Sequence, residues 1–160
     1  MLRRYVPVIR RRLGMVVLGL AVGFLSVGVA HAQDAPKANP YVFASDGALL
    51  LNFIKADKTA DYELIIGKLK EALQKSEKPE RKQQAESWKV FKAAEAGAGG
   101  AVIYVSVVYP AVKGADYTVS TILAEAFPAE AQELYKKYAE AFGTPSGNLL
   151  NLTMLSDLGK

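Results

Sequence analysis

Two apolar stretches joined by a glycine-rich loop decide the fold of this chain: WKVFKAAEAGAGGAVIYVSVVYP, residues 88–110. The second stretch, residues 101–109, has no charge and is rich in β-branched and aromatic residues, which predicts a central strand. The first, residues 87–94, alternates so that Trp88 and Val90 share one face. A short loop with glycine between two strands predicts an antiparallel hairpin.

The glycines of this loop raise the question of phosphate binding. A loop that cradles a phosphate runs from a strand into a helix, whose first N–H groups bind the anion. This loop is expected to run from strand to strand, and it lacks the Lys-Ser/Thr of a P-loop and the G-x-G-x-x-G spacing of dinucleotide folds. Gly97, Gly99 and Gly100 are therefore interpreted as turn residues, because glycine accepts a positive φ.

Changes in the hydrophobic period predict the other elements. A short apolar run at residues 48–55 predicts a strand that is covered on both faces. Apolar side chains three or four residues apart predict helices over residues 59–76 and 118–142, and Pro128 either kinks the second helix or starts a new one. Residues 147–155 alternate and predict a last strand at a sheet edge.

The resulting order is strand, helix, strand, strand, helix, strand. It predicts the ferredoxin-like β-α-β-β-α-β arrangement, an α+β fold whose four-stranded antiparallel sheet carries both helices on one face. We expect a single domain over residues 48–156, a flexible lead-in over residues 33–47 and a tail over residues 157–160. The charge run at residues 75–84 alternates in sign and is interpreted as a solvated surface segment, in which Pro79 starts one short extra turn.

The first 32 residues have the pattern of a secretory signal peptide. Five arginines lie among the first twelve residues, an uncharged apolar run covers residues 13–29, and Ala30-His31-Ala32 places small residues at a cleavage site. Cleavage after Ala32 would make the protein periplasmic or secreted, without membrane attachment. The alternative is an uncleaved membrane anchor, because the run is only slightly shorter than the roughly 20 apolar residues of a spanning helix.

The leader also carries the positive charge of the chain. The sequence has 20 Lys and Arg residues against 16 Asp and Glu residues, and without the five arginines of the leader the counts are 15 against 16, a net charge of −1. Nucleic-acid binding requires concentrated positive charge. We therefore expect no nucleic-acid partner for the mature chain.

Histidine and cysteine limit the chemistry further. The sequence has no cysteine, and its one histidine, His31, lies in the leader. A zinc site with His or Cys ligands, a Ser-His-Asp triad and a Cys-His pair are thereby excluded within one mature chain. No metal and no cofactor are expected.

The order and spacing of four stretches resemble the dimeric α+β barrel superfamily over roughly residues 48–156. These stretches are LLLNFIKADKTADYELIIGKLKEAL (49–73), WKVFKA (88–93), VIYVSVVYP (102–110) and ELYKKYAEAF (133–142). The chain also resembles small exported bacterial proteins that are often recorded as uncharacterised. The resemblance implies a homodimer whose two sheets pair, which would explain apolar residues on both strand faces. The superfamily includes cofactor-independent quinol-type monooxygenases, haem-degrading enzymes and proteins of no known activity.

The haem-degrading branch is associated with an Asn-Trp-His constellation. This sequence offers Asn52 and Trp88 but no mature histidine, and Trp88 is expected to open a strand rather than to lie on a helix. Both departures count against carrying that activity over, and likeness of fold does not transfer function.

Four residues are the candidate lining of an apolar ligand pocket between sheet and helices: Asn52, Trp88, Tyr104 and Tyr117. The alternative is that the aromatic residues belong to the core or to a dimer interface, and that the Asn52 amide is satisfied by backbone or water. No carboxylate pair, base or nucleophile motif accompanies them. No catalytic residue is assigned, and the question of an enzyme stays open, leaning towards none.

Three functions are consistent with these patterns. The leading hypothesis is an exported α+β homodimer that holds a small apolar ligand. The alternatives are a cofactor-independent monooxygenase-like enzyme for an aromatic or quinone-like substrate, and a structural or partner-binding module. A closed, solvent-accessible cavity into which Asn52 and a tyrosine point would favour a ligand or substrate, and a solid core would exclude both.

Overall fold

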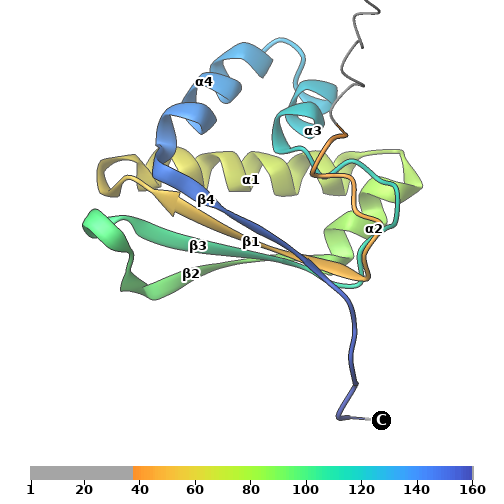
Figure 1. Ribbon diagram of the computed structural model, residues 1–160. Helices are drawn as coiled ribbons and strands as arrows, with labels where there is room; N and C mark the ends of the chain where they lie inside the picture. Colours follow the sequence, from red (N-terminus) through yellow and green to blue (C-terminus); the bar gives the residue numbers. More distant parts are fainter. Residues whose placement is uncertain (1–37, 160) are drawn as a thin grey trace, which may run out of the picture. The chain divides into compact units, whose positions relative to one another are not determined.

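The computed structural model describes residues 38–159, which form a four-stranded antiparallel sheet and four α-helices (Figure 1). The strands are β1 (Gly47–Ile54), β2 (Trp88–Ala96), β3 (Val102–Val108) and β4 (Phe142–Leu152). The helices are α1 (Thr59–Lys75), α2 (Pro79–Ser87), α3 (Val119–Ala126) and α4 (Ala131–Ala141). The α+β class is thus confirmed. The predicted signal peptide, residues 1–32, and the start of the lead-in lie outside the described residues.

The strands lie in the order β2-β3-β1-β4, and every neighbouring pair is antiparallel. The predicted hairpin is confirmed, since β2 pairs with β3 from Trp88 opposite Val108 onward. Gly99 and Gly100 in its loop have φ values of 66° and 77°, which explains these two glycines. Gly97 has a φ of −79°, so the same reason is wrong for it. The expected edge position of the last strand is also confirmed, although β4 begins five residues earlier than predicted.

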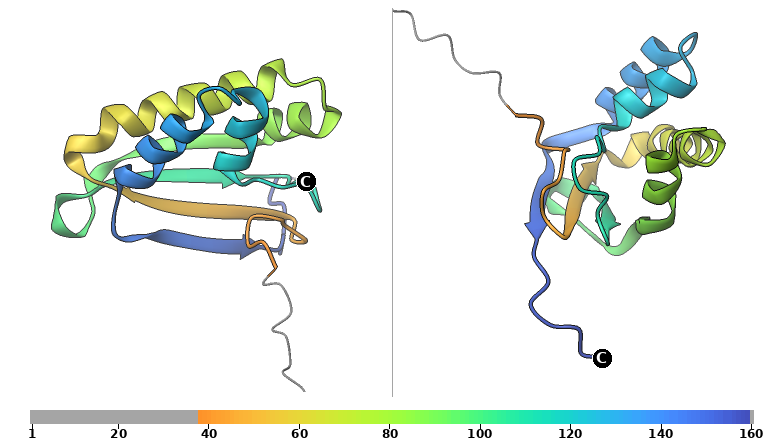
Figure 2. Two further views of the ribbon diagram at one scale, coloured as in Figure 1. Left: turned by 90° about the horizontal axis from the view of Figure 1, so that it is seen from above. Right: turned by 90° about the vertical axis from the view of Figure 1, so that its right-hand side faces the viewer.

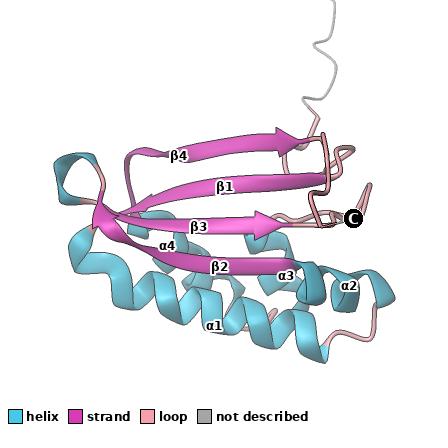
Figure 3. Ribbon diagram, turned by 90° about the horizontal axis from the view of Figure 1, so that it is seen from below, coloured by secondary structure: helices cyan, strands magenta, loops and turns pink. Residues whose placement is uncertain are grey.

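All four helices cover the same face of the sheet (Figure 2). On β3, Tyr104, Ser106 and Val108 are buried beneath them, and the residues between these point to the other face. That other face carries no helix and no further strand within residues 38–159 (Figure 3). Only one of the two apolar faces expected for the strands is therefore covered by the described chain.

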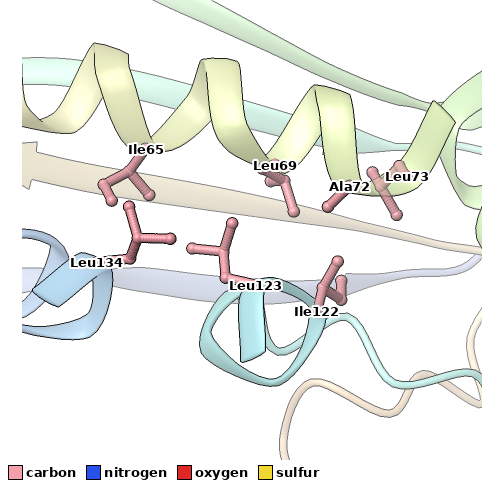
Figure 4. Packing of buried hydrophobic residues seen from close by; sticks show 7 residues of the cluster. All are labelled: Ile65, Leu69, Ala72, Leu73, Ile122, Leu123 and Leu134. Atoms are coloured by element: carbon pink, nitrogen blue, oxygen red, sulfur yellow. The ribbon is translucent and has the colours of Figure 1, made fainter. Parts of the chain in front are cut away.

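The centre of the core lies between α1 and the pair α3 and α4 (Figure 4). The cluster consists of Ile65, Leu69, Ala72, Leu73, Ile122, Leu123 and Leu134. Side chains of α1 recur in it at three- or four-residue intervals, the spacing that places them on one side of a helix. Burying a leucine or isoleucine stabilises the fold by about 1.5–3 kcal/mol, so this cluster holds the helix layer together.

The interpretation of residues 75–84 as a solvated surface segment is confirmed for most of the run, but it is wrong for Arg81 and Gln84, which are buried. Most of this run belongs to α2, a helix of nine residues rather than one short turn, and Arg81 is only 3% exposed. The Arg81 guanidinium makes a two-point contact with the Glu125 carboxylate of α3 and donates to Gln84 Oε1 at 2.8 Å. Gln84 Nε2 donates in turn to the carbonyl oxygen of Asp116. A charge can be buried when its donors are satisfied in this way.

The described part of the lead-in, residues 38–47, packs on the domain instead of leading loosely into it. Phe43 is 1% exposed, and its ring lies 5.0 Å from that of Tyr117. Val42 forms a β-bridge with Asp116, whose carboxylate also accepts a hydrogen bond from Asn39. These residues therefore belong to the fold, and they close one end of the helix layer.

None of the helices in residues 38–159 combines the length and the apolar character that crossing a membrane requires.

Candidate functional site

A cleft of about 430 Å³ lies between β1 and β4 of the sheet and the helices α3 and α4. Four tyrosines line it: Tyr41 from the lead-in, Tyr117 from the segment before α3, and Tyr135 and Tyr138 from α4. Asn52 of β1 is also part of the lining. The cleft is open to solvent rather than closed, and Tyr135 is largely exposed at its rim.

A bulge in β4 forms one wall of the cleft. Asn52 of β1 pairs with Gly147, but Ile54 two residues later pairs with Phe142, so the intervening residues of β4 bulge out of the ladder. Gly147 has a φ of 154°, and a Cβ built there would lie 2.0 Å from the carbonyl oxygen of Leu51. Glycine therefore allows β4 to return to β1 directly after the bulge.

The Asn52 amide lies where the cleft meets the aromatic core. Its Nδ2 donates a hydrogen bond to the hydroxyl oxygen of Tyr62 at 3.1 Å. No described residue hydrogen-bonds its carbonyl oxygen. An amide oxygen is a good acceptor, so this atom is available to a donor in the cleft.

Two other phenols, Tyr104 and Tyr138, pack against the Tyr62 ring that binds this amide. Tyr62 lies 4.6 Å from Tyr104 and 6.2 Å from Tyr138, measured between ring centroids. Burial raises the pKa of Tyr62 and of Tyr138 well above the usual value for a phenol, because the interior penalises the phenolate. Both hydroxyls therefore stay protonated at neutral pH.

The cleft has no charged side chain in its described lining. Its polar groups are hydroxyls and amides, contributed by Thr118, Ser120, Ser146 and Asn148 besides Asn52 and the tyrosines. Hydroxyls and amides both donate and accept hydrogen bonds, and the aromatic rings provide flat apolar surface. Such a lining can bind a neutral molecule, and it offers no carboxylate or amine as a general base.

The structure brings two of the four predicted pocket residues into this cleft, Asn52 and Tyr117. The hydroxyl oxygen of Tyr117 accepts a hydrogen bond from the Val112 N–H at 2.8 Å, which orients its ring. Trp88 does not line the cleft but packs behind Tyr117, with 5.4 Å between ring centroids. It borders a separate groove of about 280 Å³ beside α1, and its buried Nε1–H has no acceptor among the described residues.

Tyr104, the fourth predicted residue, lies outside the cleft. Its ring packs on Tyr62, and its hydroxyl donates to the Glu63 carboxylate at 2.6 Å. Lys92 of β2 donates to the same carboxylate at 2.9 Å. These hydrogen bonds hold the pKa of the exposed Glu63 carboxyl below its usual value. The three residues join α1 to the sheet at its surface.

Sequence reasoning missed the other tyrosines of the lining. Tyr135 and Tyr138 are three residues apart on one side of α4, but this spacing is equally typical of a core-facing stripe. Tyr41 lies in the segment that was interpreted as a flexible lead-in. Its role depends on Phe43 and Asp116 anchoring that segment, which are contacts across more than 70 residues of sequence.

The glycine loop has the geometry of neither a P-loop nor a dinucleotide-binding turn. It runs from β2 to β3, and no α-helix begins at it. A hollow of about 370 Å³ beside the loop is lined partly by Phe53, Lys55 and Thr144. The Lys55 ammonium group donates to the carbonyl oxygen of Glu140 at 3.0 Å, so this cation is engaged within the fold.

No group of three or more acidic, histidine or cysteine residues within residues 38–159 is arranged to hold a metal ion. Comparisons with protein-family models, with curated proteins and with solved structures give no significant match. The cleft and the surfaces of the domain are therefore the features that bear on function.

Proposed function

We propose that this protein is an exported binding protein that holds a small, neutral, largely apolar molecule in the tyrosine-lined cleft. The observation that carries the proposal is the lining itself: four tyrosines and the Asn52 amide around an uncharged space of about 430 Å³. Ligand sites are typically concave, mostly apolar and about 300–1,000 Å³ in volume, with a few polar groups that orient the ligand. This space suits a molecule of one or two rings.

The lining also supports the ligand's chemical class. A charged ligand would lose hydration on entering the cleft, and no opposite charge in the described lining would replace it. A neutral aromatic molecule with a hydroxyl group would instead stack on tyrosine rings and donate to the free carbonyl oxygen of Asn52. Export remains part of the proposal through the pattern of residues 1–32.

The finer fold assignment, ferredoxin-like, is also part of this proposal. Read from its other edge, the sheet order is β4-β1-β3-β2. β1 and β2 run parallel with β3 between them, and β3 and β4 run parallel with β1 between them. Two such split β-α-β units, with helices on one face, support the assignment.

A homodimer is the third part of the proposal, supported by the uncovered side of the sheet, which we call the open face. Its apolar side chains are Leu49, Leu51, Phe53, Phe91, Ile103, Val105, Val107, Leu150 and Leu152. Apolar patches of this extent on soluble proteins usually mark interaction sites. Within the regular ladder Lys89 is the one charged side chain of this face, and the exposed Glu95 lies in β2 where the register shifts, so little charge opposes the approach of two copies.

Native mass spectrometry of the purified mature protein tests for a ligand that co-purifies. A titration with 2-naphthol, a neutral two-ring phenol, then tests the cleft. Trp88 is the only tryptophan of the chain, and its ring contacts Tyr117 of the lining, so its fluorescence reports on occupancy. We expect saturable quenching with one site per chain.

Tyr135→Ala removes an exposed ring of the cleft and should weaken 2-naphthol binding by about tenfold, the value of one aromatic contact. Tyr109→Ala is the matched control, since Tyr109 is similarly exposed but lies outside the cleft. Absence of both a co-purified ligand and saturable quenching would contradict ligand binding. Oxygen consumption with a quinol substrate would instead favour the monooxygenase-like alternative.

A further inference from the structure

The segment that follows β4, residues 153–159, carries apolar side chains that the described domain does not cover. We call this segment the arm. Leu155 is 99% exposed and Leu158 is 96% exposed, more than any other large apolar side chain described. Met154 is also exposed. Scattered exposed leucines are common, but two nearly fully exposed leucines in one short segment suggest a surface that covers them.

The first residues of the arm are anchored to the domain, which fixes the direction in which the arm leaves it. The Met154 N–H donates to the Asp46 carboxylate at 3.1 Å, and Lys113 binds the same carboxylate at 3.0 Å. From this anchor the arm leaves the sheet on the side opposite to the helices (Figures 1 and 2). It therefore lies on the side of the open face but beyond the ends of the strands (Figure 3), from where it can reach a partner seated on that face.

We infer that the arm of each copy packs on the open face of a second copy, so that two copies exchange arms across the dimer. This inference rests on the proposed pairing of open faces. A two-fold dimer makes such an exchange reciprocal, because the same residues of both copies meet the same surface. The leucines of the arm would then lie against the apolar face, whose most exposed side chain is Phe91, at 54%.

The size of the open face supports this role for the arm. Four strands about 4.8 Å apart, with about 3.3 Å per residue over the 7 residues of β3, give a flat footprint of roughly 450 Å². A stable interface typically buries about 800 Å² on each partner. Because side chains project from the sheet, the accessible surface of the face exceeds this flat footprint, and the arm adds further apolar contact to it.

The composition of both surfaces favours a second copy as the partner. Within the regular ladder the open face has one charged side chain, Lys89, with Glu95 at the register shift of β2, and the described part of the arm has one, Asp157. An acidic or basic partner would therefore find little to pair with. Two copies bring together two largely apolar surfaces.

Sedimentation analysis of the mature protein and three variants tests the exchange. Leu155→Asp/Leu158→Asp should raise the dimer dissociation constant by about 100-fold, because it places two charges where apolar contacts are expected. Leu64→Asp is the matched control: Leu64 is an exposed leucine of α1, on the helix side of the sheet, and its variant should dimerise normally. Phe91→Asp should abolish the dimer through the open face itself.

A spin label shows which copy the arm contacts. Because the chain has no cysteine, Leu158→Cys provides a single attachment site. In mixed dimers of spin-labelled protein and ¹⁵N-labelled protein without the label, we expect paramagnetic broadening of open-face amides, such as those of Phe91 and Val105. If broadening appears only in samples in which one chain carries both the spin label and ¹⁵N, the arm contacts its own copy, and the exchange is overturned.

The results of these experiments distinguish arm exchange from the pairing of open faces on which it rests. A normal dissociation constant for the arm variant, with a monomeric Phe91→Asp variant, would overturn arm exchange and leave the pairing of open faces in place. A wild-type protein that stays monomeric at 100 µM would overturn the pairing and the exchange together. The 2-naphthol titration measures ligand binding in the cleft independently of dimerisation.

Discussion

The two halves of the domain have the same order of elements but differently built helix layers. In the first half, β1 and β2 are connected through α1, an unbroken helix of 17 residues, followed by α2. In the second half, β3 and β4 are connected through α3 and α4, which have 8 and 11 residues. Pro128 lies between these two helices, and proline prevents a helix from continuing through it.

This difference accounts for the position of the cleft. The long helix α1 contributes Ile65, Leu69 and Leu73 to the central cluster. The broken pair α3 and α4, together with the bulge of β4, encloses the tyrosine-lined space of about 430 Å³ instead. The core cluster is thus shared by both halves, and most of the lining of the cleft comes from the second half.

A core substitution on α1 tests the role of the first half. Leu69→Ala should lower the free energy of unfolding by about 3–4 kcal/mol, because it removes buried methyl groups and leaves a cavity. Leu64→Ala, on the exposed side of the same helix, should change it by about 0.5 kcal/mol or less. Urea denaturation measures both values. Similar losses for the two variants would contradict the assignment of α1 as the main core helix.

The buried arginine tests how the halves are joined, since it connects α2 to α3. Arg81→Met should destabilise the protein by about 2–3 kcal/mol, somewhat less than a fully buried pair because Glu125 is partly exposed. Lys78→Met removes the other cation bound to Glu125, which lies at the surface, and should cost less than about 1 kcal/mol. Equal effects in thermal or urea unfolding would show that burial of Arg81 is unimportant.

The bulge of β4 tests the second half. Gly147→Ala should cost about 2 kcal/mol, because alanine is strained at a φ of 154° and its Cβ would collide with the Leu51 carbonyl. It should also weaken 2-naphthol binding, since the collision must displace one wall of the cleft. Gly99→Ala has a positive φ but open space around it, so it should cost about 1 kcal/mol and leave binding unchanged. Unaltered binding in Gly147→Ala would show that the bulge does not shape the cleft.

Acidification should produce the smallest effect, again through the contact between the halves. Burial raises the pKa of the Glu125 carboxyl, but hydrogen bonds from Arg81 and Lys78 outweigh it and the pKa lies below the usual 4.5. The stabilisation is therefore complete above pH 4.5 and is lost as the pH falls through the lowered pKa. Glu125→Gln should flatten the loss of stability below pH 4.5, as measured by urea midpoints from pH 7 to 3. Glu133→Gln on α4 serves as the surface control, and an equal flattening there would contradict this origin.

Much of the secondary structure could be predicted, because hydrophobic period and glycine positions act over a few residues. The central strand, the hairpin and α1 lie within two residues of their predicted bounds. α2 was predicted only as one short turn starting at Pro79, because its polar sequence, PERKQQAES, has no apolar stripe. Its burial depends on Glu125 and Asp116, which lie more than 30 residues further along the chain.

The candidate site was predictable only in part for the same reason. Asn52 stands out as a polar residue in an apolar strand, and Tyr117 as an aromatic residue beside the second helical stretch. Trp88 and Tyr104 carry equally strong aromatic signals but pack elsewhere in the fold. Spacing identifies residues that can be buried, and only the packing of distant elements determines which of them border a cleft.

The sequence by itself determined the order of the four strands, the hairpin, the absence of histidine and cysteine from residues 33–160 and the signal-peptide pattern of residues 1–32. These follow from composition and from interactions between residues near each other in the chain. The tertiary structure decided the burial of Arg81, the position of the lead-in, the cleft at the β4 bulge and the uncovered face of the sheet. These depend on contacts across tens of residues, which form only when the helices settle on one face of the sheet and leave the other open.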